Sequence, residues 1–289
     1  MKRLTALILI TLAPLSAGQE KPPAPVPPQP EFDKTDPVAY GRALADYADL
    51  FDSGWIDEVS QGRMTLYDAG GDSVERRFSR MVLENHKQGD KLIVRFLAPA
   101  EIKGVAALTY ENSGSSDDNW LYLPSNKRVR RISGANNTAS FQGTEFTFED
   151  LSNLDPSEYE WRLLAEQDLK RGDESVPVFK LDARPLYSDT GYSRLVLYMG
   201  RENWTQERIE YYDKAGRLLK TRESTEWKLY HKRFWRSERI EMTNHQTRKH
   251  TLLVTEKQFT DLSRYTSKKT GKPRTNLTES LFTTQALQR

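Results

Sequence analysis

Along most of this chain, apolar and polar residues alternate with a period of two, as they do in β-strands that bury only one face. About a dozen segments between residues 57 and 259 show this pattern, separated by connections rich in Gly, Asn, Asp and Ser. Residues 213–216 (DKAG) form one such connection, typical of a tight hairpin between antiparallel strands. Many short strands without alternating helices predict an antiparallel, mainly β fold.

A single helix is predicted before these strands. Asp36 followed by Pro37 is a helix-start signal, because Asp caps the free backbone N–H groups and Pro suits the first helical position. Apolar residues then recur every three or four positions, at Tyr40, Ala43, Leu44, Tyr47, Leu50 and Phe51. The pattern predicts an amphipathic helix of about four turns that covers part of the sheet.

The N-terminus has the three parts of a secretory signal peptide. Lys2 and Arg3 precede an apolar stretch over residues 4–15, and small residues follow at 16–18. We therefore predict a signal peptide over residues 1–18 and export of the chain to the periplasm; an uncleaved N-terminal membrane anchor is the alternative.

The remaining chain divides by composition. Residues 19–35 are rich in proline and form a linker, either a spacer or an unstructured tail. Residues 36–266 carry the helix and strand patterns and form the folded domain. Residues 267–289 form a basic C-terminal tail, in which residues 277–289 are a candidate short helix.

Composition excludes several classes of protein. The chain has no cysteine, which excludes disulfides, thiolate metal sites, cysteine nucleophiles and a lipid-modified N-terminal cysteine. Lys and Arg exceed Asp and Glu by 43 − 41 = 2, and removal of Lys2 and Arg3 with a signal peptide leaves a neutral balance. A neutral chain is unsuited to general nucleic-acid binding.

Catalytic motifs are missing as well. The sequence has no G-x-S-x-G, H-E-x-x-H, P-loop or G-x-G-x-x-G pattern, and its four histidines have no metal-binding spacing. The acidic pairs Asp117-Asp118 and Glu149-Asp150 are candidates for acid and base catalysis, but turn and capping roles are favoured. We predict a protein that is not an enzyme and has no metal site and no cofactor.

Three neighbouring segments carry a family resemblance: W-L-Y-L-P at residues 120–124, R-R-I-S at 130–133, and G-x-x-F-x-x-E-D-L at 143–151. Together they closely resemble the bacterial outer-membrane lipoprotein-sorting protein family with the LolA-like fold. The resemblance implies a strongly curved antiparallel sheet, an incomplete or half barrel of the LolA/LolB type, whose covering helices and loops enclose an apolar cavity for acyl chains.

The resemblance gives hypotheses for a ligand site. Phe141, Phe146 and Phe148 would form part of a movable lid over the cavity, and Trp120 and Tyr122 would line the sheet beneath it. The aromatic content of 10% suits a lined cavity or a solidly packed core, and the sequence leaves both open.

Arg130 or Arg131 would hold a lipid head group at the mouth of the cavity, since both lie in a basic run on a predicted strand; a solvated face of that strand is the alternative. The resemblance implies lipid or lipoprotein acyl chains as ligands, transient membrane contact, and an inner-membrane RND-type exporter as a partner. The leading interpretation is a periplasmic carrier that transfers acyl chains toward the outer membrane. The alternative is a lipid-sensing regulatory or adaptor module on the same fold that binds an envelope protein.

Overall fold

Thirteen strands form one antiparallel sheet in the residues that the computed structural model describes, which are 24–85, 88–112, 114–132, 134–264 and 277–288. The strands are β1 (Asp57–Tyr67), β2 (Ser73–Leu83), β3 (Lys91–Ala98), β4 (Ala106–Tyr110), β5 (Asp118–Leu123), β6 (Arg128–Ile132), β7 (Tyr159–Arg171), β8 (Glu174–Pro185), β9 (Arg194–Gly200), β10 (Gln206–Tyr212), β11 (Leu218–Tyr230), β12 (Phe234–Asn244) and β13 (Lys249–Thr260). The predicted signal peptide, residues 1–18, lies outside the described residues.

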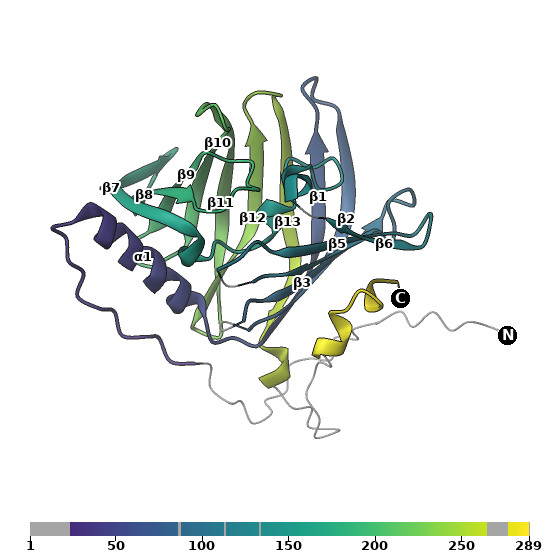
Figure 1. Cartoon of the computed structure of the whole chain (residues 1–289), viewed down its shortest axis with the longest axis horizontal. Coiled ribbons are helices and arrows are strands. Elements are labelled where there is room, and N and C mark those ends of the chain that lie inside the picture. The colour runs from purple at the N-terminus through teal and green to yellow at the C-terminus, as the bar shows by residue number, and fades with distance from the viewer. Residues whose placement is uncertain (1–23, 86–87, 113, 133, 265–276, 289) are drawn as a thin grey trace.

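The sheet is strongly curved and unclosed (Figure 1). Its strand order is β6-β5-β4-β3-β2-β1-β13-β12-β11-β10-β9-β8-β7, so β6 and β7 are its two edges. The prediction of a mainly β, incomplete barrel is confirmed. Because β6 and β7 follow each other in sequence but lie at opposite edges, the chain between them must cross the open side of the half barrel.

Residues 134–158 make this crossing, and we call them the β6–β7 connection. It contains three short 3₁₀ helices, η1 (Gly134–Thr138), η2 (Glu149–Leu151) and η3 (Pro156–Glu158). Further 3₁₀ turns lie near the C-terminus at η4 (Leu262–Arg264), η5 (Glu279–Leu281) and η6 (Ala286–Gln288).

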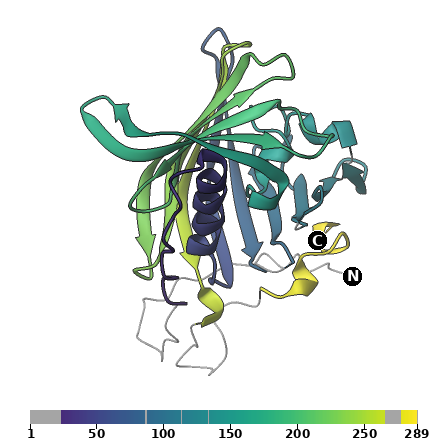
Figure 2. The ribbon, with the colours of Figure 1, turned by 60° about the vertical axis from the view of Figure 1, so that its left-hand side comes forward.

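The predicted helix is confirmed as α1 (Pro37–Asp52). Asp36 caps it by accepting a hydrogen bond from the Val38 backbone N–H at 2.8 Å. The helix packs against β7 so closely that a Cβ on Gly41 would lie 2.6 Å from the backbone nitrogen of Leu163. Only glycine fits there, and this close approach fixes the helix on the inner side of the curved sheet (Figure 2). The expectation of several covering helices is corrected, since α1 is the only α-helix within the described ranges.

Two apolar clusters lie on the concave face of the sheet. The first packs α1 against β7 to β11 and includes Leu44, Trp161 and Leu197. The second packs β1 to β5 against the β6–β7 connection and includes Phe96 and Phe141. The helix therefore covers one half of the concave face, and the connection covers the other half and extends into the first, where Phe146 and Leu154 pack.

The opposite face near β6 is covered by the C-terminal segment. Leu277, Phe282 and Leu287 are buried in a third cluster against β1 and β3 to β6. The prediction of a basic tail over 267–289 is therefore corrected for residues 277–288, because their apolar side chains bind them to the sheet. The other residues of that tail lie outside the described residues.

Part of the proline-rich linker also packs on the domain. Phe32 contacts the rings of Tyr40, Tyr47 and Trp204, with ring centroids 5.6 to 6.1 Å away. The hydroxyl of Tyr47 donates a hydrogen bond to the Pro27 carbonyl at 2.9 Å. This portion of the linker is therefore bound to α1 rather than a free spacer. Among the described residues, no helix combines the length and the apolar character needed to cross a membrane.

Candidate functional site

A cavity of about 630 Å³ lies inside the half barrel, between the concave face, α1 and the β6–β7 connection. Apolar side chains of both concave clusters form much of its wall. Those from the strands include Met64, Phe78, Leu92, Val94, Trp161, Leu195, Leu197, Met199 and Tyr211. Its volume lies within the range of about 300–1,000 Å³ that is usual for ligand pockets. The interior is therefore not solidly packed.

The cavity reaches the surface where α1 faces the end of the β6–β7 connection. Asp49 on α1 lines the cavity and is exposed to solvent, as are Asn153 and Ser157 on the connection. Exposed residues on both sides of the same space mark an opening.

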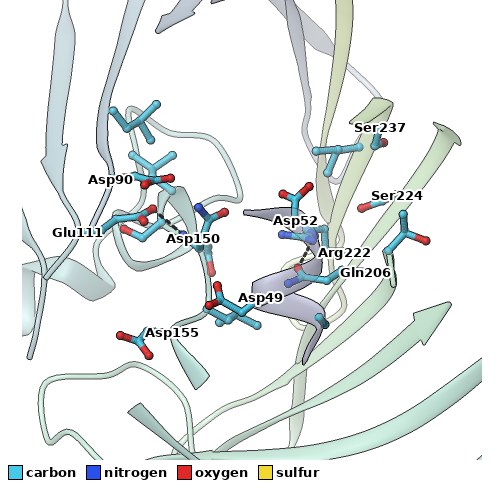
Figure 3. Close-up of a pocket in the computed structure, with 18 of the residues that line it drawn as sticks. Asp49, Asp52, Asp90, Glu111, Asp150, Asp155, Gln206, Arg222, Ser224 and Ser237 are labelled. Carbon is cyan, nitrogen blue, oxygen red and sulfur yellow. Dashed lines mark hydrogen bonds between the residues drawn. The ribbon is translucent and has the colours of Figure 1, made fainter. Parts of the chain in front are cut away.

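The lining of the cavity is strongly acidic, a property that the sequence analysis missed. Eleven Asp and Glu residues line the space, against three arginines. The acids are Asp49, Asp52, Glu58, Glu84, Asp90, Glu111, Asp117, Glu149, Asp150, Asp155 and Glu158. Figure 3 shows Asp90 and Glu111 on the side opposite Arg222 and Gln206. The predicted apolar cavity is therefore apolar in its walls and charged over much of the remaining lining.

Burial and mutual repulsion raise the pKa values of several of these carboxyls. Burial raises the pKa of Glu84, of Glu111 and of Glu158 to about 8 in each case, and neighbouring carboxylates add to the shift. For Glu158 those neighbours include Asp117 and Asp155. Burial likewise raises the pKa of Asp117 to about 6. The acids therefore lie close enough to repel one another.

The arginines of the lining bind nearby acids or amides. Glu58 is almost fully buried and pairs with Arg80 and with Arg236, whose Nε lies 2.7 Å from the carboxylate. Burial opposes its ionisation, but the two arginines hold the pKa of Glu58 below its ordinary value. Arg236 also contacts Asp52 at 2.7 Å, which ties the end of α1 to the sheet. Arg222 donates to Gln206 at 2.7 Å.

A buried ion pair fixes the β6–β7 connection over the concave face. Nζ of Lys220 on β11 lies 2.5 Å from the carboxylate of Asp150, and the two side chains are only 2% and 1% exposed. The Asp150 carboxylate also accepts hydrogen bonds from the Thr147 backbone N–H at 2.6 Å and the Tyr192 hydroxyl at 2.7 Å. Glu149 accepts from the Gly191 backbone N–H at 2.9 Å. Both acids of this pair are therefore occupied in holding the chain, in keeping with the favoured structural roles.

The structure brings one of the three lid aromatics to the cavity. Phe146 lines the space, whereas Phe141 and Phe148 are buried beside it in the cluster with Phe96. All three rings are buried, and the Lys220 pair holds the segment that carries them. In the structure the aromatic segment is a fixed wall, and its opening stays a hypothesis.

The expectation that Trp120 and Tyr122 lie beneath the aromatic segment is wrong. Both pack in the cluster on the opposite face, together with the C-terminal segment. Their strand neighbours Leu121 and Leu123 face the concave side instead. Successive side chains of a strand point to opposite faces, and the sequence alone did not show which set points inward.

The two arginines predicted at the mouth also lie elsewhere. Arg130 and Arg131 are exposed on the edge strand β6, and neither lines the cavity. Arg131 pairs with Asp118 on the adjacent strand. Because the side chains of Arg130 and Arg131 are exposed on the edge strand and do not reach the cavity, the geometry does not support head-group binding by these arginines at its mouth.

Comparisons with known proteins agree with this architecture. A family model described only as an uncharacterized protein matches residues 88–289. An outer-membrane lipoprotein-sorting protein domain from Vibrio parahaemolyticus is 33% identical, with a TM-score of 0.77 over 86% of this chain and 98% of that one. A DUF1329 family protein from Desulfovibrio piger is 25% identical, with a TM-score of 0.76 over 88% and 100% of the two chains.

A LolA superfamily protein from Nitrosomonas europaea shares the fold at 17% identity, with a TM-score of 0.63 over 85% of this chain and 98% of that one. No curated protein sequence matches the chain.

Proposed function

The chain belongs to the outer-membrane lipoprotein-sorting protein family with the LolA-like fold, and from this premise we propose that it is a periplasmic carrier without catalytic activity. It binds the acyl chains of a lipid or lipoprotein in the cavity of the half barrel and moves them toward the outer membrane. An inner-membrane RND-type exporter as a partner is part of the proposal through the family resemblance alone.

The observation that carries the proposal is the cavity of about 630 Å³ between two apolar clusters, open at one side. Burial of each methylene contributes about 0.8 kcal/mol, so an acyl chain of about 16 carbons gains roughly 13 kcal/mol by leaving water. A bilayer offers the same gain. A carrier must therefore match the bilayer closely, so that small differences in affinity decide the direction of transfer.

Cavity filling tests this proposal without adding charge. Ala48 on α1 lines the cavity, so Ala48→Trp places an indole in the acyl-chain space. Ala39→Trp is the matched control, because residue 39 is exposed on the same helix. Both variants and the original protein are purified gently from the envelope, and bound lipids are measured by mass spectrometry of organic extracts.

We expect lipid in the original protein and in Ala39→Trp, and its loss in Ala48→Trp. Transfer of a fluorescent lipid between two vesicle populations should decrease in parallel. Equal lipid content in all three proteins would place the acyl chains outside the cavity. Bound lipid that never exchanges between vesicles would favour the sensing or adaptor function over transport.

A further inference from the structure

Five carboxylates gather at one side of the cavity, and we call them the acidic rim: Glu84, Glu111, Asp117, Asp155 and Glu158. They come from the ends of β2 and β4, the chain before β5, and the η3 turn of the β6–β7 connection. Asp155 and Glu158 flank the exposed Ser157, at the opening. The acidic rim therefore lies between solvent and the apolar walls.

Backbone groups hold the rim carboxylates in place. Glu84 accepts a hydrogen bond from the Gly54 N–H at 2.6 Å, and Glu111 accepts from the Asn153 N–H at 2.8 Å. Asp117 accepts from the Asn112 N–H at 3.0 Å. Side chains fixed by backbone N–H groups of other residues in this way are pre-organised for a ligand.

The rim has little compensating positive charge. None of its five members takes part in an ion pair among the described residues, and Arg80, the one arginine that acts on Glu111, is already bound by Glu58. Oε1 of Glu158 is buried and has no hydrogen-bond donor within the described part of the chain. A buried acceptor without a donor is unfavourable in an empty cavity and is satisfied by a ligand that brings one.

Walls and rim together define a class of ligand. The apolar walls suit an alkyl or acyl chain, and the rim suits a head that carries positive charge and N–H donors. An anionic head such as a phosphate or sulfate would find no unpaired cation at the rim within the described residues, because Arg80 is already bound by Glu58. We propose that the cargo is an amphiphile with an amine head, whose tail lies among the cavity walls and whose ammonium group binds the acidic rim; this inference rests on the proposed carrier function.

The raised pKa values of Glu84, Glu111 and Glu158 support this assignment. Repulsion between carboxylates contributes to all three, and an ammonium group among them would remove that repulsion. The Lys220 to Asp150 pair shows the opposite case in the same fold, where a buried carboxylate already has its cation. The five rim carboxyls have no such cation within the described residues.

Three probes of equal chain length separate the contribution of the head from that of the tail. Dodecylamine, dodecanol and dodecyl sulfate are titrated below their micelle concentrations into the delipidated full-length protein, and binding is measured by calorimetry at pH 7.5. The same titrations use Glu111→Gln/Glu158→Gln and the control Glu75→Gln, which changes an exposed acid on β2 outside the cavity.

We expect dodecylamine to bind about tenfold more tightly than dodecanol, and dodecyl sulfate to bind more weakly than either. The double variant should lose about tenfold in dodecylamine affinity and keep its dodecanol affinity, while Glu75→Gln changes neither. Equal binding of all three probes, or preference for the sulfate, would overturn the inference and leave the carrier proposal intact. If no probe binds, including the neutral alcohol, the carrier proposal itself fails. The probe series on the unchanged protein is decisive even if a variant does not fold.

Discussion

The buried ion pair between Lys220 and Asp150 tests how firmly the β6–β7 connection is held over the cavity. The perturbation is Lys220→Met, which keeps a long flexible side chain and removes the ammonium group. Asp150 then remains buried with hydrogen bonds from Thr147 and Tyr192 but without its cation. Removal of one partner from a buried pair costs about 3–5 kcal/mol, because the remaining charge has no compensation.

For a domain of this size, each kcal/mol changes the melting temperature by about 2–4 °C, so Lys220→Met should lower Tm by about 10 °C. Thermal unfolding followed by circular dichroism measures this change. Hydrogen exchange should also accelerate in the β6–β7 connection before it does so in the sheet.

Lys228→Met is the matched control. Lys228 lies on the same strand and pairs with Glu238, but its side chain is 59% exposed, so the loss should stay below about 1 kcal/mol. Lys220→Met/Asp150→Asn should be more stable than Lys220→Met alone, because the uncompensated charge is gone and an oxygen acceptor for Thr147 remains. If Lys220→Met and Lys228→Met melt at the same temperature, the buried pair does not fix the connection.

Other predictions follow from the rim, the C-terminal segment and the helix contact. Since burial raises the pKa of Glu84, Glu111 and Glu158 from 4.5 to about 8, the native state keeps protons that the unfolded state loses. The free energy of unfolding in urea should therefore fall from pH 5 to pH 8, with a smaller fall in Glu111→Gln; a rise with pH would contradict this. Phe282→Ala should lower that free energy by about 3–5 kcal/mol, and a near-neutral effect would show that residues 277–288 are not part of the fold. Gly41→Ala should lower Tm, because the new Cβ would lie 2.6 Å from the β7 backbone, and an unchanged Tm would show that the helix can move away at no cost.

Local patterns predicted the elements of the fold. The Asp36 and Pro37 signal placed the start of α1, and the alternation of apolar residues placed most strands, because capping and strand pleating depend on neighbouring residues. The antiparallel sheet then follows from the short connections. Helix capping and strand alternation are both determined by short stretches of sequence.

The candidate site depends on contacts that such stretches do not contain. The Lys220 to Asp150 pair joins residues 70 positions apart, and the acidic rim gathers side chains from several loops and strand ends. The one local signal for this ion pair was Lys220 itself, a lysine at a position of β11 that faces the concave side of the sheet. Trp120 and Tyr122 were assigned to the wrong face because strand alternation defines two sets of side chains but not which set points inward.

The packing of the C-terminal segment, where residues 277–289 were a candidate short helix, was missed for a related reason. Leu277, Phe282 and Leu287 are widely spaced, and short 3₁₀ turns place them together on the outer face. Neither the helical nor the strand period describes such a segment, so a basic composition dominated its interpretation.

The central claim is that acyl chains occupy the cavity inside the half barrel, and covalent mapping tests it most directly. A long-chain alcohol with a photoreactive group midway along its chain is bound, irradiated and located by peptide mass spectrometry. We predict labels on cavity-facing residues such as Leu92 and Leu197. Labels confined to the outer face, for example to residues 277–288, would contradict the account.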